Sequence, residues 1–106
     1  MHTVDSIREL LRNNDRAVAR ALVALTNRQT SDEQRDENTK HRNDVGFMPC
    51  DARMGTSMAR FFQRNGYLSD KQIAWWRRPR KNGRQRIEAY AAQLLDIAQQ
   101  RAIMQP

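Results

Sequence analysis

The sequence is poor in the residue types that build metal centres and nucleophilic sites. It has one cysteine and two histidines among 106 residues, so neither an internal disulfide nor a thiolate cluster around a metal ion can form. His2 and His41 have no histidine or cysteine at ligand spacing, and no motif supports a dyad of His41 with Cys50. Only four glycines are present, and they form no phosphate-binding loop or nucleophile elbow. We therefore expect no cofactor, no metal site and no catalytic residues, and we predict that the chain is not an enzyme.

Long apolar runs are also missing. Apolar residues make up 39% of the chain, and no stretch of them is long enough to cross a bilayer. Residues 1–5 have neither the basic start nor the apolar core of a signal peptide. A lone cysteine is compatible with a reducing compartment. Together these features predict a cytoplasmic protein that acts in the cell where it is made.

The apolar residues that are present recur three and four positions apart through most of the chain. Alternation typical of a strand never lasts beyond a few positions. This pattern predicts an all-α fold, a single helical domain over residues 1–106 built as a compact bundle of about five short helices. Residues 32–44 contain no large apolar side chain, which predicts a polar loop near residues 35–46.

Local signals place the first two helices. Thr3 is expected to cap a helix that ends at Asn13-Asn14, and Asp15 is expected to cap a second helix that continues to about Arg28. Overlapping capping boxes in Thr30–Gln34 then predict a short helical turn that runs into the polar loop.

Further signals follow the polar segment, where Phe47 is expected to return the chain to the core. A helix with Asp51 as its cap and Met54, Met58, Phe61 and Phe62 as its apolar stripe is expected to end at Asn65-Gly66. Ser69 and Gln72 form a capping box for the next helix. The last helix is expected over about residues 84–102.

The balance of charge is strongly basic. There are 19 lysines and arginines against 12 acidic residues, a formal charge of +7, and 16 of the 19 cations are arginine. Arginine pairs in a bidentate manner with phosphate and carboxylate, so such a surface suits a polyanion or an acidic protein face. The alternative is that the net charge serves only solubility.

The cations are densest just before the last helix. Six of them, with no acid, lie within residues 77–86 and follow Trp75 and Trp76. Trp76 lies three residues after Ile73 and is expected in the core, which leaves Trp75 partly exposed. The candidate partner-binding residues are Trp75, Arg77, Arg78, Arg80, Lys81, Arg84 and Arg86. Such a cluster can grip phosphates and stack on bases, or meet acidic side chains of a protein, or remain solvated.

Four short motifs carry a resemblance to known proteins. In order they are Gly46-Phe47, Asp51-Ala52, Ser57-Met58-Ala59 and Gly66-Tyr67-Leu68-Ser69-Asp70-Lys71-Gln72. In this order and spacing they resemble a group of small proteins from bacteriophages and other mobile elements. In length and character the chain also looks like a phage anti-CRISPR protein, in particular a type I-E inhibitor of Pseudomonas.

The resemblance implies a non-enzymatic, phage-encoded inhibitor that works inside the host bacterial cell. Such inhibitors bind the type I CRISPR-Cas surveillance complex, a ribonucleoprotein, or its helicase-nuclease, and block interference. No catalytic residue is carried over with the resemblance. The alternative is a direct nucleic-acid-binding protein or a regulator of a mobile element, which would bind DNA or RNA with strong salt dependence.

Overall fold

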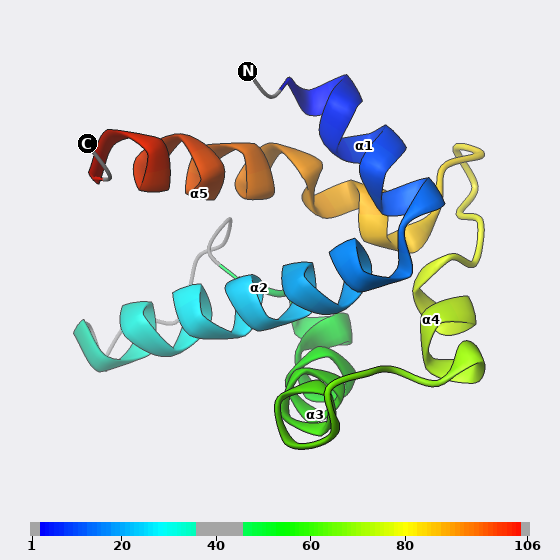
Figure 1. The fold of residues 1–106 in the computed structure, drawn as a ribbon, viewed down its shortest axis with the longest axis horizontal. Helices are drawn as coiled ribbons and strands as arrows, with labels where there is room; N and C mark the ends of the chain where they lie inside the picture. The colour runs from blue at the N-terminus through cyan, green and yellow to red at the C-terminus, as the bar shows by residue number, and fades with distance from the viewer. Residues whose placement is uncertain (1–2, 36–45, 105–106) are drawn as a thin grey trace.

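The structure is a computed structural model, and it describes residues 3–35 and 46–104. The helices are, in order, α1 (Val4–Asn13), α2 (Asp15–Arg35), α3 (Pro49–Asn65), α4 (Asp70–Trp76), the short 3-10 helix η1 (Arg86–Tyr90) and α5 (Ala91–Met104). The described ranges contain no strand, and the prediction of an all-α bundle of about five helices is confirmed (Figure 1). The predicted polar loop near residues 35–46 lies, except for its two end residues, outside the described part of the chain.

Helix α2 is the central element of the bundle. It packs against α1, α3, α4 and α5. In Figure 1, α1 and α5 lie on one side of α2, and α3 and α4 lie on the other side. Across residues 3–35 and 46–104, no helix combines the length and the apolar character that a membrane span requires.

The start of α1 follows its sequence signal, whereas the start of α2 does not. The Thr3 hydroxyl accepts a hydrogen bond from the backbone N–H of Ser6 at 3.1 Å, which confirms Thr3 as the cap of α1. The prediction that Asp15 caps α2 was wrong. The side chain of Asn14 accepts the N–H of Ala17 at 3.1 Å, so Asn14 occupies the capping position and Asp15 is the first helical residue.

Helix α2 is also longer than its apolar stripe predicted, since it ends at Arg35 and not near Arg28. The segment Thr30–Gln34 lies inside this helix, so the prediction of a separate helical turn there was wrong. Residues 26–35 contain neither proline nor glycine, and a helix that is already formed adds one hydrogen bond for each further residue. Cap-type residues therefore did not interrupt it.

For α3, the C-terminal end follows its sequence signal and the N-terminal end does not. Gly66 has a φ of 82° and its N–H donates to Phe62 O, which confirms the left-handed C-terminal cap. The start differs, because Met48 is the N-cap and Asp51 lies inside the first turn. Met54, predicted for the apolar stripe, is 40% exposed and was assigned to the wrong face.

Helix α4 begins where its capping box predicted. The Ser69 hydroxyl accepts the N–H of Gln72 at 3.2 Å, and the Gln72 side chain accepts the N–H of Ser69 at 2.8 Å. The last helix differs from the prediction at its beginning. Its first turn is the 3-10 helix η1, and α-helical geometry starts only at Ala91.

The core gathers around Trp76, which is fully buried as predicted. Its indole N–H donates to the sulfur of Met58 at 3.0 Å, and the ring of Phe47 lies 5.8 Å from its centroid. The ring of Phe47 fits against Gly55, where an added Cβ would lie 2.4 Å from ring carbons. Phe47 is thus the anchor that the sequence predicted.

Asp51 is the one aspartate buried within the described core. Its carboxylate accepts hydrogen bonds from the guanidinium of Arg86 and from the hydroxyl of Tyr90, the latter at 2.5 Å. The Tyr90 hydroxyl in turn accepts the N–H of Met48 at 3.1 Å. Burial and hydrogen bonding to the carboxylate raise the pKa of Tyr90 above its ordinary value, so the phenol stays protonated. These contacts join the start of α3 to η1.

Replacing Asp51 with Asn tests how far the fold depends on this carboxylate. We expect the free energy of unfolding to fall by about 2–4 kcal/mol, because Arg86 and Tyr90 both lose a charged acceptor. Urea denaturation followed by circular dichroism at neutral pH measures the loss. The matched control Asp5→Asn, with a side chain that is 92% exposed, should cost less than about 1 kcal/mol. Equal losses in the two variants would contradict the assignment.

Candidate functional site: a cationic hairpin

The segment between α4 and η1 folds back on itself as a small hairpin. The N–H of Arg80 donates to Arg84 O at 2.7 Å, and the N–H of Arg86 donates to Arg78 O at 2.9 Å. An isolated antiparallel bridge joins Pro79 to Gln85 between these bonds. We call residues 78–86 the cationic hairpin. Its backbone is ordered by its own hydrogen bonds.

Local sequence accounts for the turn of the hairpin. Pro79 lacks an N–H and cannot continue α4. At the tip, Gly83 has a φ of 82°, which a residue with a Cβ rarely adopts, and its N–H donates to Arg80 O at 2.8 Å. The side chain of Asn82 accepts the N–H of Arg84 at 3.0 Å. The Asn-Gly pair therefore closes the turn with local hydrogen bonds.

Two of the predicted binding residues are instead engaged inside the molecule. Arg77 donates to the carboxylate of Asp15 at 2.6 Å and to Leu11 O at 3.1 Å, so it ties the end of α4 to the junction of α1 and α2. Arg86 donates to the buried carboxylate of Asp51 and lies 4.6 Å from the ring centroid of Trp75. Both guanidinium groups are neutralised where they stand.

Trp75 is half-buried, and Arg86 covers one of its ring faces. Its ring also meets Trp76 edge to face, with 4.7 Å between centroids. Its partial exposure agrees with the prediction, but one stacking face is already occupied. The ring is therefore poorly placed to serve as an open platform for a nucleic-acid base.

The remaining candidates form one group at the surface. All four are exposed, and none makes a side-chain hydrogen bond or ion pair with another residue of the described ranges; they are Arg78, Arg80, Lys81 and Arg84. The hairpin brings them together, because the backbone bond between Arg80 and Arg84 sets their Cα atoms opposite one another. Four positive charges on one loop, none paired with a described carboxylate, can attract a phosphate or carboxylate surface.

Besides Asp51, a second buried acid, Glu88, contacts the base of the hairpin. Its carboxylate accepts the N–H of Gln85 at 2.9 Å and a hydrogen bond from Arg12 of α1 at 2.9 Å. Burial by itself would raise the pKa of Glu88, but the hydrogen bonds from Arg12 and Gln85 outweigh it, and the pKa lies below its ordinary value. The same contact raises the pKa of Arg12. The carboxylate therefore stays ionised and anchors the hairpin to α1.

A second group of arginines without ion pairs lies on the outer face of α3. Arg53, Arg60 and Arg64 line a shallow depression with Thr56 and Ser57 between them. No described carboxylate pairs with any of the three arginines. This face carries charge like that of the hairpin, but on a different element.

Sequence reasoning missed the two acids that hold the hairpin in place. Asp51 carried the local signal of a helix cap, and Glu88 carried no signal at all. Their partners Arg86 and Arg12 lie 35 and 76 residues away along the chain. Within residues 3–35 and 46–104, no group of three or more histidine, cysteine, aspartate or glutamate side chains could hold a metal ion.

Comparisons with protein-family models, with curated proteins and with solved structures return no match for this chain. The candidate site is therefore defined by its geometry and charge. Four exposed cations, an ordered loop and two buried anchoring acids are its components.

Acid titration tests the anchoring role of Glu88. A carboxylate whose folded pKa is lowered stabilises the fold above its unfolded pKa, and this contribution disappears as the pH falls through the folded pKa. The difference in the free energy of unfolding between the native chain and Glu88→Gln should thus be large at about pH 6 and shrink toward about pH 3. The exposed control Glu9→Gln should show a small difference at both pH values, measured by urea denaturation. A difference for Glu88→Gln that is the same at both would contradict this role.

Proposed function

We propose that this chain is a non-enzymatic binding protein that sets its cationic hairpin against an anionic surface of a larger complex and blocks that surface by occupying it. One observation carries the proposal. Arg78, Arg80, Lys81 and Arg84 stand together on an ordered loop with no carboxylate of the described chain to neutralise them.

The ordered backbone of the cationic hairpin supports this proposal. A partner that binds a disordered basic segment must overcome the entropy of fixing it, about 1–2 kcal/mol for each residue. Here the hydrogen bonds of the hairpin and the contacts of Arg77 and Glu88 hold the backbone before any partner arrives. Preorganisation of this kind raises affinity by lowering the cost of binding.

The target follows from the resemblance to phage anti-CRISPR proteins. Under this proposal the chain binds a type I CRISPR-Cas surveillance complex, such as that of type I-E, or its helicase-nuclease, in the cytoplasm of the host bacterium. Complexes that handle RNA and DNA present both phosphates and acidic protein faces, and arginine can pair with either. Occlusion needs no catalytic group on the inhibitor.

Direct binding to nucleic acid is the alternative function, and the arginines on α3 favour it. Arg53, Arg60 and Arg64 add a second set of unpaired cations, so the chain offers charge to phosphates on more than one element. Because Arg86 occupies one face of the Trp75 ring, a base of a single strand cannot stack on that face. A duplex backbone is the nucleic acid that this surface suits better.

The decisive experiment compares the two targets directly. The purified chain is added to a reconstituted type I-E interference assay and, separately, to random duplex and single-stranded DNA in a gel-shift assay. Inhibition and binding to the protein complex without a DNA shift support the first function. A DNA shift without affinity for the complex supports the alternative, and neither activity would overturn both.

Reversal of the hairpin charge should abolish the activity. The triple variant Arg80→Glu, Lys81→Glu and Arg84→Glu should bind at least about a hundredfold more weakly, since three reversed charges cost about 1 kcal/mol each or more. Helical content by circular dichroism should not change, because these side chains are exposed and form no ion pair with a described residue.

The matched control carries the same change of charge on α3, as Arg53→Glu, Arg60→Glu and Arg64→Glu. If the hairpin is the binding surface, this variant should retain most of the affinity. An equal loss in both variants would show that net charge, and not the hairpin, carries binding.

The salt dependence separates the alternative function further. If the four hairpin cations neutralise phosphates of duplex DNA, the logarithm of the binding constant should fall against the logarithm of salt concentration with a slope of about −4. The hairpin triple variant should lower the magnitude of this slope by about 3. A slope unchanged by the variant would exclude the hairpin as the phosphate contact.

A further inference from the structure

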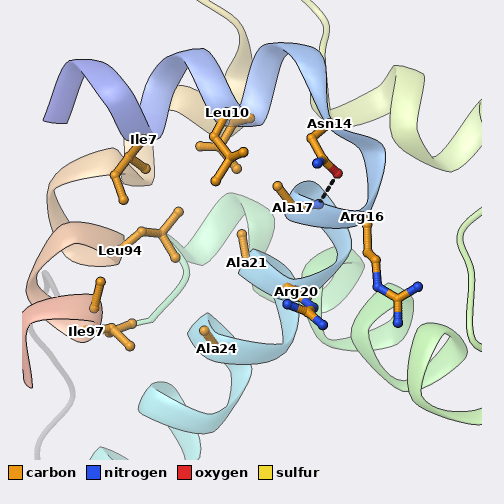
Figure 2. Close-up of a pocket in the computed structure, with 12 residues that line it drawn as sticks. Ile7, Leu10, Asn14, Arg16, Ala17, Arg20, Ala21, Ala24, Leu94 and Ile97 are labelled. Carbon is orange, nitrogen blue, oxygen red and sulfur yellow. Dashed lines mark hydrogen bonds between the residues drawn. The ribbon is translucent and has the colours of Figure 1, made fainter. Parts of the chain in front are cut away.

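An apolar groove lies between α1, α2 and α5, on elements other than the cationic hairpin. Its volume is about 320 Å³. Figure 2 shows Ile7 and Leu10 of α1 and Leu94 and Ile97 of α5 on one side of the groove, facing α2. Leu10 is 43% exposed, which is unusual for a large apolar side chain that points into a concavity.

The opposite wall of the groove is made of small side chains. Ala17, Ala21 and Ala24 of α2 face the groove at intervals of four and three residues (Figure 2). Because none of them extends beyond Cβ, the groove has room for side chains from outside. A volume of about 320 Å³ is at the lower end of the range for ligand sites and accommodates two or three aliphatic side chains.

Among the described residues that line the groove, the charged side chains are both positive. Arg16 and Arg20 of α2 are among the residues that line it; both are exposed, and neither forms an ion pair with a described residue. The other polar lining residue, Asn14, already uses its side chain to cap α2. Acidic groups of an occupant would therefore find charge-assisted hydrogen-bond donors here.

We propose that this groove binds one amphipathic, acidic helix of a partner protein, with apolar side chains between Leu10 and Ala21 and carboxylates opposite Arg16 and Arg20. The proposal concerns a second surface and does not depend on the function of the hairpin. The two arginines are four residues apart, one helical turn, so carboxylates spaced by one turn on the occupant match them.

The walls of the groove explain why the occupant is a helix. All three are helices whose backbone groups are hydrogen-bonded internally, so no strand edge is offered to an extended peptide. A helix satisfies its own backbone and needs only side-chain contacts. Leu10 of the groove is 43% exposed, and a helix laid over it covers more of this apolar surface than a single aliphatic chain does.

Fluorescence anisotropy with two synthetic helical peptides tests the proposal. Both carry leucine at one-turn intervals along one face; one has glutamate beside this face, and the other has lysine at the same positions. The native chain should bind the glutamate peptide at least about tenfold more tightly than the lysine peptide. Failure of the glutamate peptide to bind at about 1 mM, or equal binding of both, would overturn the proposal.

Variants of the chain locate the site. Leu10→Gln should weaken binding of the glutamate peptide about tenfold or more, whereas Met54→Gln, a matched change of a leucine-sized side chain that is 40% exposed on α3, should leave it unchanged. Arg16→Glu with Arg20→Glu should invert the preference toward the lysine peptide; these two residues are exposed, so folding is maintained. Equal losses for Leu10→Gln and Met54→Gln would overturn the assignment.

Two further measurements address other occupants. If dodecanoate displaces the peptide at submicellar concentration while the two peptides bind equally, the site is one for small amphiphiles and the proposal fails. If Leu10→Gln converts a dimer into a monomer in analytical ultracentrifugation, the groove is covered by a second copy and the proposal also fails. The hairpin triple variant should keep its affinity for the glutamate peptide, which separates this test from that of the proposed function.

Discussion

The buried carboxylate of Asp51 is the group around which the start of α3, η1 and the base of the cationic hairpin are arranged. A buried ion must be paired, because removal from water costs several kcal/mol. Arg86 and Tyr90 supply that pairing, and in doing so they fix η1 against the start of α3. Since Arg86 also lies over Trp75, the same interaction places the end of α4. Asp51 thus fixes the last residue of the hairpin, while Glu88 holds Gln85 beside it and Arg77 ties the end of α4 to Asp15.

Pairing with carboxylates of the chain divides the cations of residues 77–86 into two kinds. Arg77 and Arg86 face carboxylates of the chain itself and stabilise the fold. The exposed cations Arg78, Arg80, Lys81 and Arg84 form no ion pair with a described carboxylate. The proposed function uses only the second kind. The first kind keeps the loop in one position, which is what allows a few charges to act together on a partner.

The apolar groove follows from a different feature, the small side chains on one face of α2. That helix is the centre of the bundle, and its buried leucines Leu22 and Leu25 hold the core. Its alanine face, in contrast, leaves a space between α2 and the helices α1 and α5. The chain thus presents the cationic hairpin and the apolar groove on separate elements. The two proposed contacts can therefore be tested independently.

The sequence by itself determined the features that depend on neighbouring residues. The caps at Thr3, Ser69 and Gly66, and the burial of Trp76, could be predicted because each follows from backbone geometry within one helical turn. Only the tertiary structure decided which charges pair. Asp51 meets Arg86 across 35 residues and Arg77 meets Asp15 across 62, and no local pattern encodes such a meeting. The division of the cationic cluster into anchors and exposed charges could not be predicted for this reason: the partner of a charged side chain is whatever the packing of helices brings within reach.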